Sequence, residues 1–262
     1  MSRDHKTGDI GTEFTRKLLR RLGRDIRGAG NRILDYKGAR GVWIDVGAHS
    51  GNVTFHHAQN NPSLLVYAFE PNWKLAAKMM GKLANFVVLP MAVSDQDGLA
   101  EFFVNSMDAA SSLLPMDDAG LKGWAGGESL RVESAIVVHT IRLDTFIESM
   151  DIKDVDYLKI DTQGADLKVV QSLGSRISDI RRITLEADLK SIRLYKGSAS
   201  KDEIVKYLEG SGFNLSGVET QTLGQEENLT FDRMADGTSM TKDQGLDAKA
   251  HSIPKQVLRK RA

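Results

Sequence analysis

Short apolar segments alternate with segments of helical periodicity from residue 42 onward, and this alternation constrains the fold more than any other feature. We expect strands at 42–46, 64–69, 86–89, 155–160, 180–186, 213–218 and 228–231. We expect helices at 51–60, 73–83, 165–173 and 202–209. Strands separated by helices indicate βαβ units, whose right-handed crossovers place helices on both faces of a mostly parallel sheet. The sequence therefore predicts a doubly wound α/β sheet.

The composition fits one large domain and excludes several classes of function. The 262 residues, 41% of them hydrophobic, can bury one substantial core. Lys plus Arg and Asp plus Glu both total 35, so no net positive field attracts nucleic acid. The absence of cysteine excludes disulfides, thiolate zinc sites and a cysteine nucleophile. No apolar run is as long as a membrane span, and the first residues lack the apolar core of a secretory signal, so we expect a cytoplasmic protein.

The folded domain is expected at residues 41–232. Residues 1–40 are expected to form a polar segment and a basic amphipathic helix. We interpret this helix as packing on the domain, although such a helix can also contact a membrane or an acidic partner. Residues 233–262 contain few apolar side chains and are predicted to be a disordered tail.

Residues 97–142 interrupt the alternation and are predicted to form a hairpin insertion. Two strand-like segments, 100–104 and 134–141, flank a long stretch that is rich in Ser, Asp and Gly. The insertion leaves the carboxyl edge of the sheet, which is where open α/β sheets bind ligands. We therefore favour a lid or a substrate-facing element for residues 105–133 over a surface hairpin without a role.

An acidic residue and a glycine turn follow the first strand, in the order Asp45, Gly47, His49 and Gly51. The dinucleotide-binding fingerprint requires three glycines, and His49 and Asn52 occupy two of those positions. A pyrophosphate needs the second glycine for close backbone approach, so a nicotinamide dehydrogenase is disfavoured. A methionine moiety can lie over this turn with its ammonium group facing Asp45. A plain strand-to-helix turn is the alternative for this segment taken alone.

Acidic and small side chains follow the second and third strands. Glu70 ends the second strand beside the glycine turn, where it can accept hydrogen bonds from vicinal ribose hydroxyls, and Pro71 then fixes a turn. Taken with the glycine turn, Glu70 favours an adenosine cofactor over a helix-capping role. Ser94 and Asp95 follow the third strand, at the edge where an adenine ring is expected, although a turn aspartate is an alternative.

The catalytic residue is expected at the end of the fourth strand. Asp161 leaves this strand where a transferred methyl group should lie, and it is the first candidate for a general base. His139, in the returning strand of the insertion, is the second candidate, although a solvent-facing histidine is the simpler interpretation. Glu186, at the end of the fifth strand, is a weaker candidate. Asp161, Glu186 and Asp188 carry oxygen ligands that suit Mg²⁺, but nothing in the sequence shows that they converge, and we assign no metal.

Taken as an ordered set, five segments of the chain resemble the FkbM family of S-adenosylmethionine-dependent methyltransferases. They are 45–51 (Asp-Val-Gly-Ala-His-Ser-Gly), 67–71 (Tyr-Ala-Phe-Glu-Pro), 92–95 (Ala-Val-Ser-Asp), 142–146 (Arg-Leu-Asp-Thr-Phe) and 158–166 (Leu-Lys-Ile-Asp-Thr-Gln-Gly-Ala-Asp). The resemblance covers residues 40–232 and implies a class I methyltransferase (Rossmann-like) sheet with an antiparallel last strand. It also implies S-adenosylmethionine as the cofactor. The implied acceptor is a hydroxyl of a sugar, a polyketide or another small metabolite, and not nucleic acid.

The resemblance also implies a set of cofactor-binding residues: Asp45, Gly47, Ala48, Gly51, Glu70, Pro71, Asn72, Ser94 and Asp95. The chain departs from the family's usual pattern at two positions, with His49 where asparagine is common and Gln163 where glutamate is usual. If that glutamate acts as a base or a metal ligand, Gln163 removes its charge. A catalytically silent domain that binds the cofactor or a partner is therefore the main alternative to an enzyme. Within the fourth motif, Asp144 is expected to cap a helix that begins at Thr145.

Overall fold

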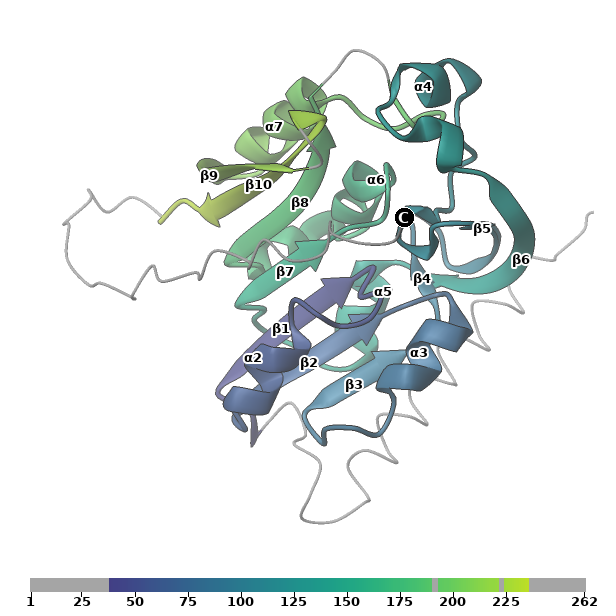
Figure 1. The fold of residues 1–262 in the computed structure, drawn as a ribbon. Helices are drawn as coiled ribbons and strands as arrows, with labels where there is room; N and C mark the ends of the chain where they lie inside the picture. The colour runs from purple at the N-terminus through teal and green to yellow at the C-terminus, as the bar shows by residue number, and fades with distance from the viewer. Residues whose placement is uncertain (1–37, 190–192, 222–223, 236–262) are drawn as a thin grey trace, which may run out of the picture.

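The computed structural model describes residues 38–189, 193–221 and 224–235, which form two β-sheets and their covering helices (Figure 1). The basic helix predicted within residues 1–40 and the tail predicted at 233–262 fall almost wholly outside these ranges. Within the described ranges, every helix is too short or too polar to span a membrane.

The larger sheet has seven strands in the order β3-β2-β1-β7-β8-β10-β9. Five of them run parallel: β1 (Gly41–Val46), β2 (Leu64–Phe69), β3 (Phe86–Leu89), β7 (Tyr157–Ile160) and β8 (Arg182–Asp188). The last strand, β10 (Glu226–Arg233), lies antiparallel to β8 and to β9 (Phe213–Gln221). The predicted doubly wound sheet with an antiparallel last strand is confirmed. The chain order reverses at β1, so a ligand crevice is expected where β1 and β7 end.

Helices cover both faces of this sheet. They are α2 (Phe55–Asn60), α3 (Trp73–Met79), α5 (Leu143–Ser149), α6 (Asp166–Gln171) and α7 (Lys201–Gly210). Every side chain of β2 is buried, and alternate residues enter different cores. Tyr67 and Phe69 pack edge-on against Phe146 of α5, with ring centroids 5.1 and 4.9 Å apart. Val66 and Ala68 pack instead with the residues of α2 and α3. A strand buried on both faces is a continuous apolar run, which explains why β2 has its predicted bounds.

The insertion forms a second sheet of three strands in the order β4-β6-β5. These strands are β4 (Ala92–Val93), β5 (Gly98–Asn105) and β6 (Val132–Ile141), with β5 and β6 antiparallel as predicted for a hairpin. Between β5 and β6 lie the 3-10 turn η2 (Asp108–Ala110), α4 (Asp118–Gly123) and the 3-10 turn η3 (Gly127–Ser129). A further 3-10 segment, η4 (Gly174–Asp179), follows α6. In Figure 1 the insertion stands beside the carboxyl ends of the central strands.

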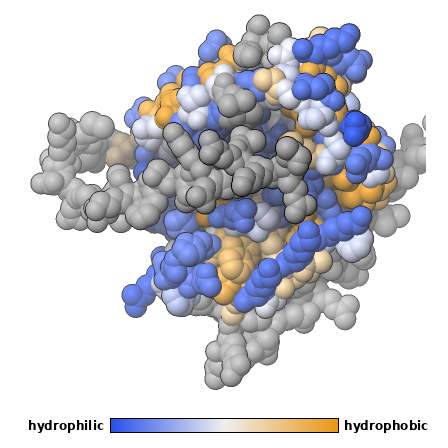
Figure 2. Space-filling model, in the orientation of Figure 1, coloured by the Kyte–Doolittle hydropathy of each residue, from blue (hydrophilic) through white to orange (hydrophobic). Residues whose placement is uncertain are grey.

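Helices α2 and α3 are shorter than predicted, each because of a glycine. α2 begins at Phe55 and not at residue 51, because Gly51 has a left-handed backbone with φ of +77°. α3 ends at Met79 and not at residue 83, because Gly81 (φ +73°) turns the chain. Figure 2 shows a hydrophobic area between these short helices, over β2 and β3, on a surface that is otherwise mostly hydrophilic.

The capping role predicted for Asp144 is wrong. α5 begins at Leu143, so Asp144 lies in its first turn, where its carboxylate accepts hydrogen bonds of 2.6 and 2.9 Å from the Arg142 guanidinium. The third amide of α5, that of Thr145, donates to Asp144 Oδ1 (2.7 Å), and the first two are satisfied by a residue distant in sequence. The amide of Leu143 donates to Ser172 Oγ (3.1 Å), and that of Asp144 donates to the Ser172 carbonyl (3.1 Å).

Candidate active site

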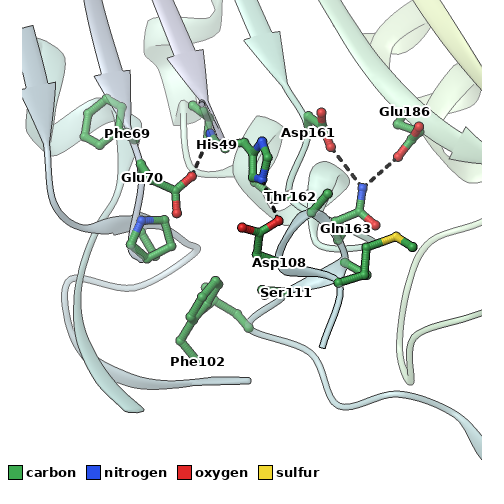
Figure 3. Close-up of a pocket in the computed structure, with 18 of the residues that line it drawn as sticks. His49, Phe69, Glu70, Phe102, Asp108, Ser111, Asp161, Thr162, Gln163 and Glu186 are labelled. Carbon is green, nitrogen blue, oxygen red and sulfur yellow. Dashed lines mark hydrogen bonds and ion pairs between the residues drawn. The ribbon is translucent and has the colours of Figure 1, made fainter. Parts of the chain in front are cut away.

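A cavity of about 300 Å³ lies at the carboxyl edge of the larger sheet. One wall comes from the ends of β1, β2, β7 and β8, and the other comes from the insertion. Figure 3 shows side chains from both walls converging on it. Open α/β sheets bind ligands at this position, where the order of the strands reverses.

The turn after β1 requires glycine at position 47. Gly47 has φ of +75°, and a Cβ built on it would lie 1.8 Å from the carbonyl oxygen of Asp161. The amides of Gly47 and Ala48 donate to the Phe69 carbonyl at 3.0 and 2.9 Å, which fastens the turn to the end of β2. The turn therefore joins the ends of β1, β2 and β7, and Gly47 lines the cavity there.

Two other predicted residues of this turn lie outside the cavity lining. Ala48 is buried in the core shared with α2 and α3. A Cβ on Gly51 would lie 2.9 Å from Sδ of Met79, so this glycine allows the turn to pack closely on α3. Both residues therefore support the turn from the side that packs on α2 and α3, away from the cavity.

Asp45 does not face the cavity, contrary to the expectation that it meets the ammonium group of a cofactor. Its side chain is 1% exposed and accepts hydrogen bonds from Thr54 Oγ1 (2.5 Å) and Lys159 Nζ (3.0 Å). Lys159 also donates to the Gly47 carbonyl at 3.1 Å. Burial opposes the charge on Lys159, but the carboxylates of Asp45 and Asp161 outweigh it and raise the pKa of this lysine. Asp45 therefore stabilises the glycine turn through Lys159, which contacts both residues.

Glu70 lines the cavity at the end of β2, where the sequence places it. Its Oε2 accepts a hydrogen bond from the amide of His49 (2.7 Å), and its Oε1 accepts one from the amide of Asn72 (2.8 Å). Burial raises the pKa of Glu70 to about 7, although these two hydrogen bonds oppose the rise. A carboxylate has about four acceptor positions, so Glu70 can still accept hydrogen bonds from a ligand. Pro71 also lines the cavity, whereas the Asn72 side chain caps α3.

An apolar wall beyond Glu70 suits a flat aromatic ring. Its members come from β2, from β5 and from the segment around β4: Phe69, Met91, Ala92, Val93 and Phe102. Ser94 and Asp95, predicted to contact adenine, do not line the cavity. β4 pairs with β6 at this point and carries the next residues away, and the Ser94 amide donates to the Ile141 carbonyl at 3.0 Å.

His49 and Asp108 connect the glycine turn to the insertion. His49 Nε2 lies 2.9 Å from Asp108 Oδ1, and both side chains line the cavity (Figure 3). The hydrogen bond with His49 holds the pKa of Asp108 below its usual value. The side chains are 39% and 52% exposed, so the pair contributes little to stability but fixes the position of η2.

Three polar side chains converge at the other end of the cavity (Figure 3). The Asp161 side chain is 43% exposed, and its Oδ2 lies 3.6 Å from Lys159 Nζ. Gln163 Nε2 donates hydrogen bonds of 3.0 Å to both Asp161 Oδ1 and Glu186 Oε2. Burial raises the pKa of Glu186 well above its usual range, and neighbouring carboxylates raise it further. This end of the cavity therefore holds one accessible carboxylate beside a lysine and a second, more buried one.

Apolar side chains of the insertion complete this end. Leu113, Trp124 and Leu130 line the cavity, together with Leu194 from the loop before α7. Trp124 is buried and packs with Leu194 and Tyr195. A molecule that reaches Asp161 from this side would therefore contact an aromatic and aliphatic wall.

The second candidate base, His139, does not line the cavity. It lies opposite Leu99 in the β5–β6 pair, and its neighbour Val138 packs with Phe102 in the core of the insertion. Alternate residues of a strand face opposite sides, so His139 faces away from the Phe102 side. Over the same described part of the chain, no three His, Asp or Glu side chains are grouped so that they could hold a metal ion.

Sequence reasoning missed several residues of the cavity, among them Phe102, Asp108, Trp124 and Glu226. Glu226 begins β10 and pairs with Asp188 at the end of β8. Because β10 is antiparallel to β8, its first residue lies at the edge of the sheet where β8 ends. The predicted direction of the last strand could therefore have identified Glu226. Phe102 is an apolar residue in a predicted strand, but its facing depends on how the insertion docks. Asp108 and Trp124 lie in irregular stretches without a periodic signal.

The chain is similar in sequence and in fold to known proteins. The chain is 25% identical over 167 residues to the 2-O-methyltransferase NoeI of Sinorhizobium fredii, a match that covers 60% of this chain and 66% of that protein. Among solved structures it is similar to M. capricolum TrmK in complex with S-adenosyl-homocysteine (TM-score 0.42, 10% identity, 84% of this chain and 68% of that chain). It is also similar to Aeropyrum pernix fibrillarin with bound S-adenosyl-L-methionine (TM-score 0.43, 13% identity, 82% and 74%).

The family assignment rests on a longer match. The methyltransferase FkbM domain matches residues 45–215, a range that runs from the glycine turn after β1 into β9 and includes the insertion. The chain therefore belongs to the FkbM family of methyltransferases, whose cofactor is S-adenosyl-L-methionine.

Proposed function

We propose that this chain transfers a methyl group from S-adenosylmethionine to a hydroxyl of a small metabolite that carries no negative charge. One observation carries the proposal: the carboxylates of Glu70 and Asp161 line the same cavity from the ends of β2 and β7, on either side of β1. One carboxylate suits the ribose of the cofactor, and the other suits the proton of the acceptor. The name of the Sinorhizobium relative, a 2-O-methyltransferase, supports a hydroxyl acceptor.

The residues present fit the cofactor. In this proposal the apolar wall around Phe69, Met91 and Phe102 holds the adenine ring, and Glu70 accepts hydrogen bonds from the ribose hydroxyls. Gly47 lines the cavity, so its backbone can contact the methionine moiety. The bound cofactor supplies a methyl group on a positively charged sulfur, so the donor needs no further activation.

The chain's own residues then align the acceptor and take its proton. Asp161 accepts the proton of the acceptor hydroxyl as the new carbon–oxygen bond forms and the carbon–sulfur bond breaks. Lys159, 3.6 Å from Asp161 Oδ2, stabilises the ionised carboxylate before the proton arrives. The wall around Trp124 and Leu194 orders the acceptor and excludes water.

The charges that line the cavity favour an acceptor without phosphate or carboxylate groups. Glu70, Asp108, Asp161, Glu186 and Glu226 line it, and among the residues that the structure describes no Lys or Arg does. Nucleic-acid-binding sites instead present Lys and Arg to phosphates. The proposed acceptor is therefore a small molecule with an apolar part and not a nucleic acid.

The experiment compares Asp161→Asn with the unchanged chain. Release of S-adenosylhomocysteine is measured with metabolite extracts as the source of acceptor, and the Kd for S-adenosylmethionine is measured by calorimetry. We expect turnover to fall about 10²–10⁴-fold, the usual range for loss of a general base. The Kd should change little, because Glu70 and the apolar wall are untouched. His139→Gln, outside the cavity, is the matched control and should keep its turnover.

Two results would contradict the proposal in different ways. A stable Asp161→Asn variant with normal cofactor binding and near-normal turnover would exclude Asp161 as the base. Cofactor binding without methyl release from any extract would instead favour a catalytically silent domain.

A further inference from the structure

We propose that Gln163 is a positioning residue that holds Asp161 and Glu186 as an unequal pair, with Asp161 as the proton acceptor and Glu186 as a neutral hydrogen-bond donor. The proposal rests on the function proposed above, because it concerns the same end of the cavity. It assigns roles to Gln163 and Glu186 that general-base catalysis by Asp161 alone does not require.

The geometry of Gln163 is the first argument. Its backbone is left-handed (φ +57°), an uncommon conformation for a residue with a side chain. The single atom Nε2 donates one hydrogen bond of 3.0 Å to each carboxylate. Carboxylate oxygens accept hydrogen bonds, so the amide nitrogen and not the amide oxygen must face them. The amide oxygen, Oε1, lies 3.0 Å from the hydroxyl of Tyr195.

The contacts of the Gln163 backbone are the second argument. Its carbonyl accepts a hydrogen bond of 2.8 Å from Ser112 Oγ, so the insertion holds the backbone in place. Ser112 thus holds the backbone of Gln163, and the Tyr195 hydroxyl lies beside its amide oxygen. A side chain held in this way can set the separation and orientation of Asp161 and Glu186, which come from the neighbouring strands β7 and β8.

The charges around the two carboxylates are the third argument, because they differ. Asp161 has Lys159 as a cationic neighbour, at 3.6 Å, besides the carboxylates of Asp166 and Glu186. Glu186 is half-buried, and the charged groups that act most on it are the carboxylates of Asp161, Asp166, Asp188 and Glu226. These neighbours belong to β7, α6, β8 and β10, and they raise the pKa of Glu186 after burial has raised it. When environments separate the pKa values of paired acids, one serves as the base and the other as the donor.

Gln163 fits this division better than an acidic residue would. Its two N–H groups satisfy one oxygen of each carboxylate without adding charge. A carboxylate at position 163 would place a third acid in the same hydrogen-bond network, and at least two of the three would then share a proton.

The test uses the full chain saturated with S-adenosylhomocysteine. Carbon-13 NMR follows the side-chain carboxyl carbons of Asp and Glu from pH 5 to 9, and Asp161→Asn and Glu186→Gln assign the two signals. We expect Glu186 to titrate well above the ordinary range of a glutamate. In Gln163→Glu we expect both titrations to move upward by about one pH unit, the effect of a nearby like charge.

Two variants separate this role from a merely structural one. Gln163→Met removes both N–H donors at similar size, and it should also move the Asp161 titration upward. Ser106→Ala removes hydroxyl contacts to Asn105, Ser129 and Arg131 and none to Gln163, so it should leave both titrations unchanged. The acid limb of the pH profile of kcat, measured with an active extract, should follow the Asp161 titration in every variant.

Two results would overturn the inference. One is that Glu186 and Asp161 titrate together at ordinary carboxyl values. The other is that Gln163→Glu leaves both titrations where they were. The NMR measurement needs no acceptor, so it stands apart from the test of the proposed function. If the titrations behave as expected but Asp161→Asn keeps its turnover, the unequal pair stands and the catalytic role of Asp161 does not.

Discussion

Gly47 ties the turn that we propose receives the cofactor to the strand that carries the proposed base. Its missing side chain lets the turn after β1 pass directly against the Asp161 carbonyl. Its backbone is also left-handed, so glycine is required here for two separate reasons, space and conformation. A substitution at this position should therefore affect stability and cofactor binding together.

Gly47→Ala tests this residue, with Gly126→Ala as the matched control. Gly126 is also left-handed (φ +86°), but no atom lies within 4 Å of a Cβ built there. We expect Gly126→Ala to lower the free energy of unfolding by about 1–2 kcal/mol, the cost of that conformation for a residue with a Cβ. Gly47→Ala should lower it further and weaken S-adenosylmethionine binding by about tenfold or more, equivalent to about 1.4 kcal/mol. Urea unfolding and calorimetry measure the two effects, and equal losses in both variants would contradict the steric argument.

At the residue scale, sequence alone places side chains that directly follow a strand. Gly47, Glu70 and Asp161 lie where they were predicted, because the end of a buried strand fixes each position. The contacts of Asp45 were not predictable, because its partner Lys159 is 114 residues away. The proposed role of His139 as a base required knowing which face of the insertion meets the cavity, and local sequence does not contain that information.

The insertion is fastened to the main sheet by its own polar contacts. Ser112 bonds to the Gln163 carbonyl, the Tyr195 hydroxyl donates to the Ala110 carbonyl at 2.9 Å, and Asp108 pairs with His49. These contacts make residues 105–133 one wall of the cavity. A ligand in the cavity would add further contacts to the same wall and so hold it more firmly.

Limited proteolysis tests whether this wall responds to ligands. Trypsin can cut the insertion after Lys122 and Arg131, which are exposed. We expect cleavage there to slow severalfold when S-adenosylhomocysteine and an active extract are present, because a bound ligand disfavours local opening. Lys153, whose side chain is 65% exposed in a loop after α5, is the internal control and should be cut at an unchanged rate. Equal cleavage of the insertion with and without these ligands would show that this wall of the cavity does not respond to them.

At the element scale, the strands were easier to predict than the helices. β2 and β3 have their predicted bounds, because they are apolar runs between turn residues. α2 and α3 were extended too far, because apolar periodicity continues through the left-handed glycines that break them. Nothing in the local pattern of residues 213–233 says that β10 lies between β8 and β9. That order follows from how the strands pair across the whole sheet.

Buried carboxyl groups link the stability of the whole molecule to pH. Burial raises the pKa of Asp166 to about 7, with a further rise from Asp161, and burial raises that of Glu70 to about 7. A carboxyl group with a higher pKa in the folded chain binds its proton more tightly when folded. Its stabilising effect is complete below the unfolded pKa of about 4 and is lost as the pH rises through about 7.

We therefore expect the free energy of unfolding to fall by about 1–3 kcal/mol between pH 5.5 and pH 8. Urea unfolding at several pH values measures it. Asp166→Asn should make this dependence shallower, because it removes one of the two buried carboxyl groups. Asp118→Asn, at an exposed position in α4, is the control and should leave the slope unchanged. Stability that rises with pH across this interval in the unchanged chain would contradict the expectation.

Gly98 and Thr140 face each other at the open end of the β5–β6 hairpin, so the insertion leaves and rejoins the main sheet at nearly one place. Over the course of evolution such a segment can be lengthened or replaced while the strand order and the glycine turn stay as they are. A second, much shorter segment has to be exchanged with it. The Leu194 carbonyl accepts a hydrogen bond from the Asp117 amide, and the Lys196 amide donates to the Pro115 carbonyl. New acceptors can therefore be recruited through these two segments, while the glycine turn and Glu70, which we propose hold the cofactor, stay as they are.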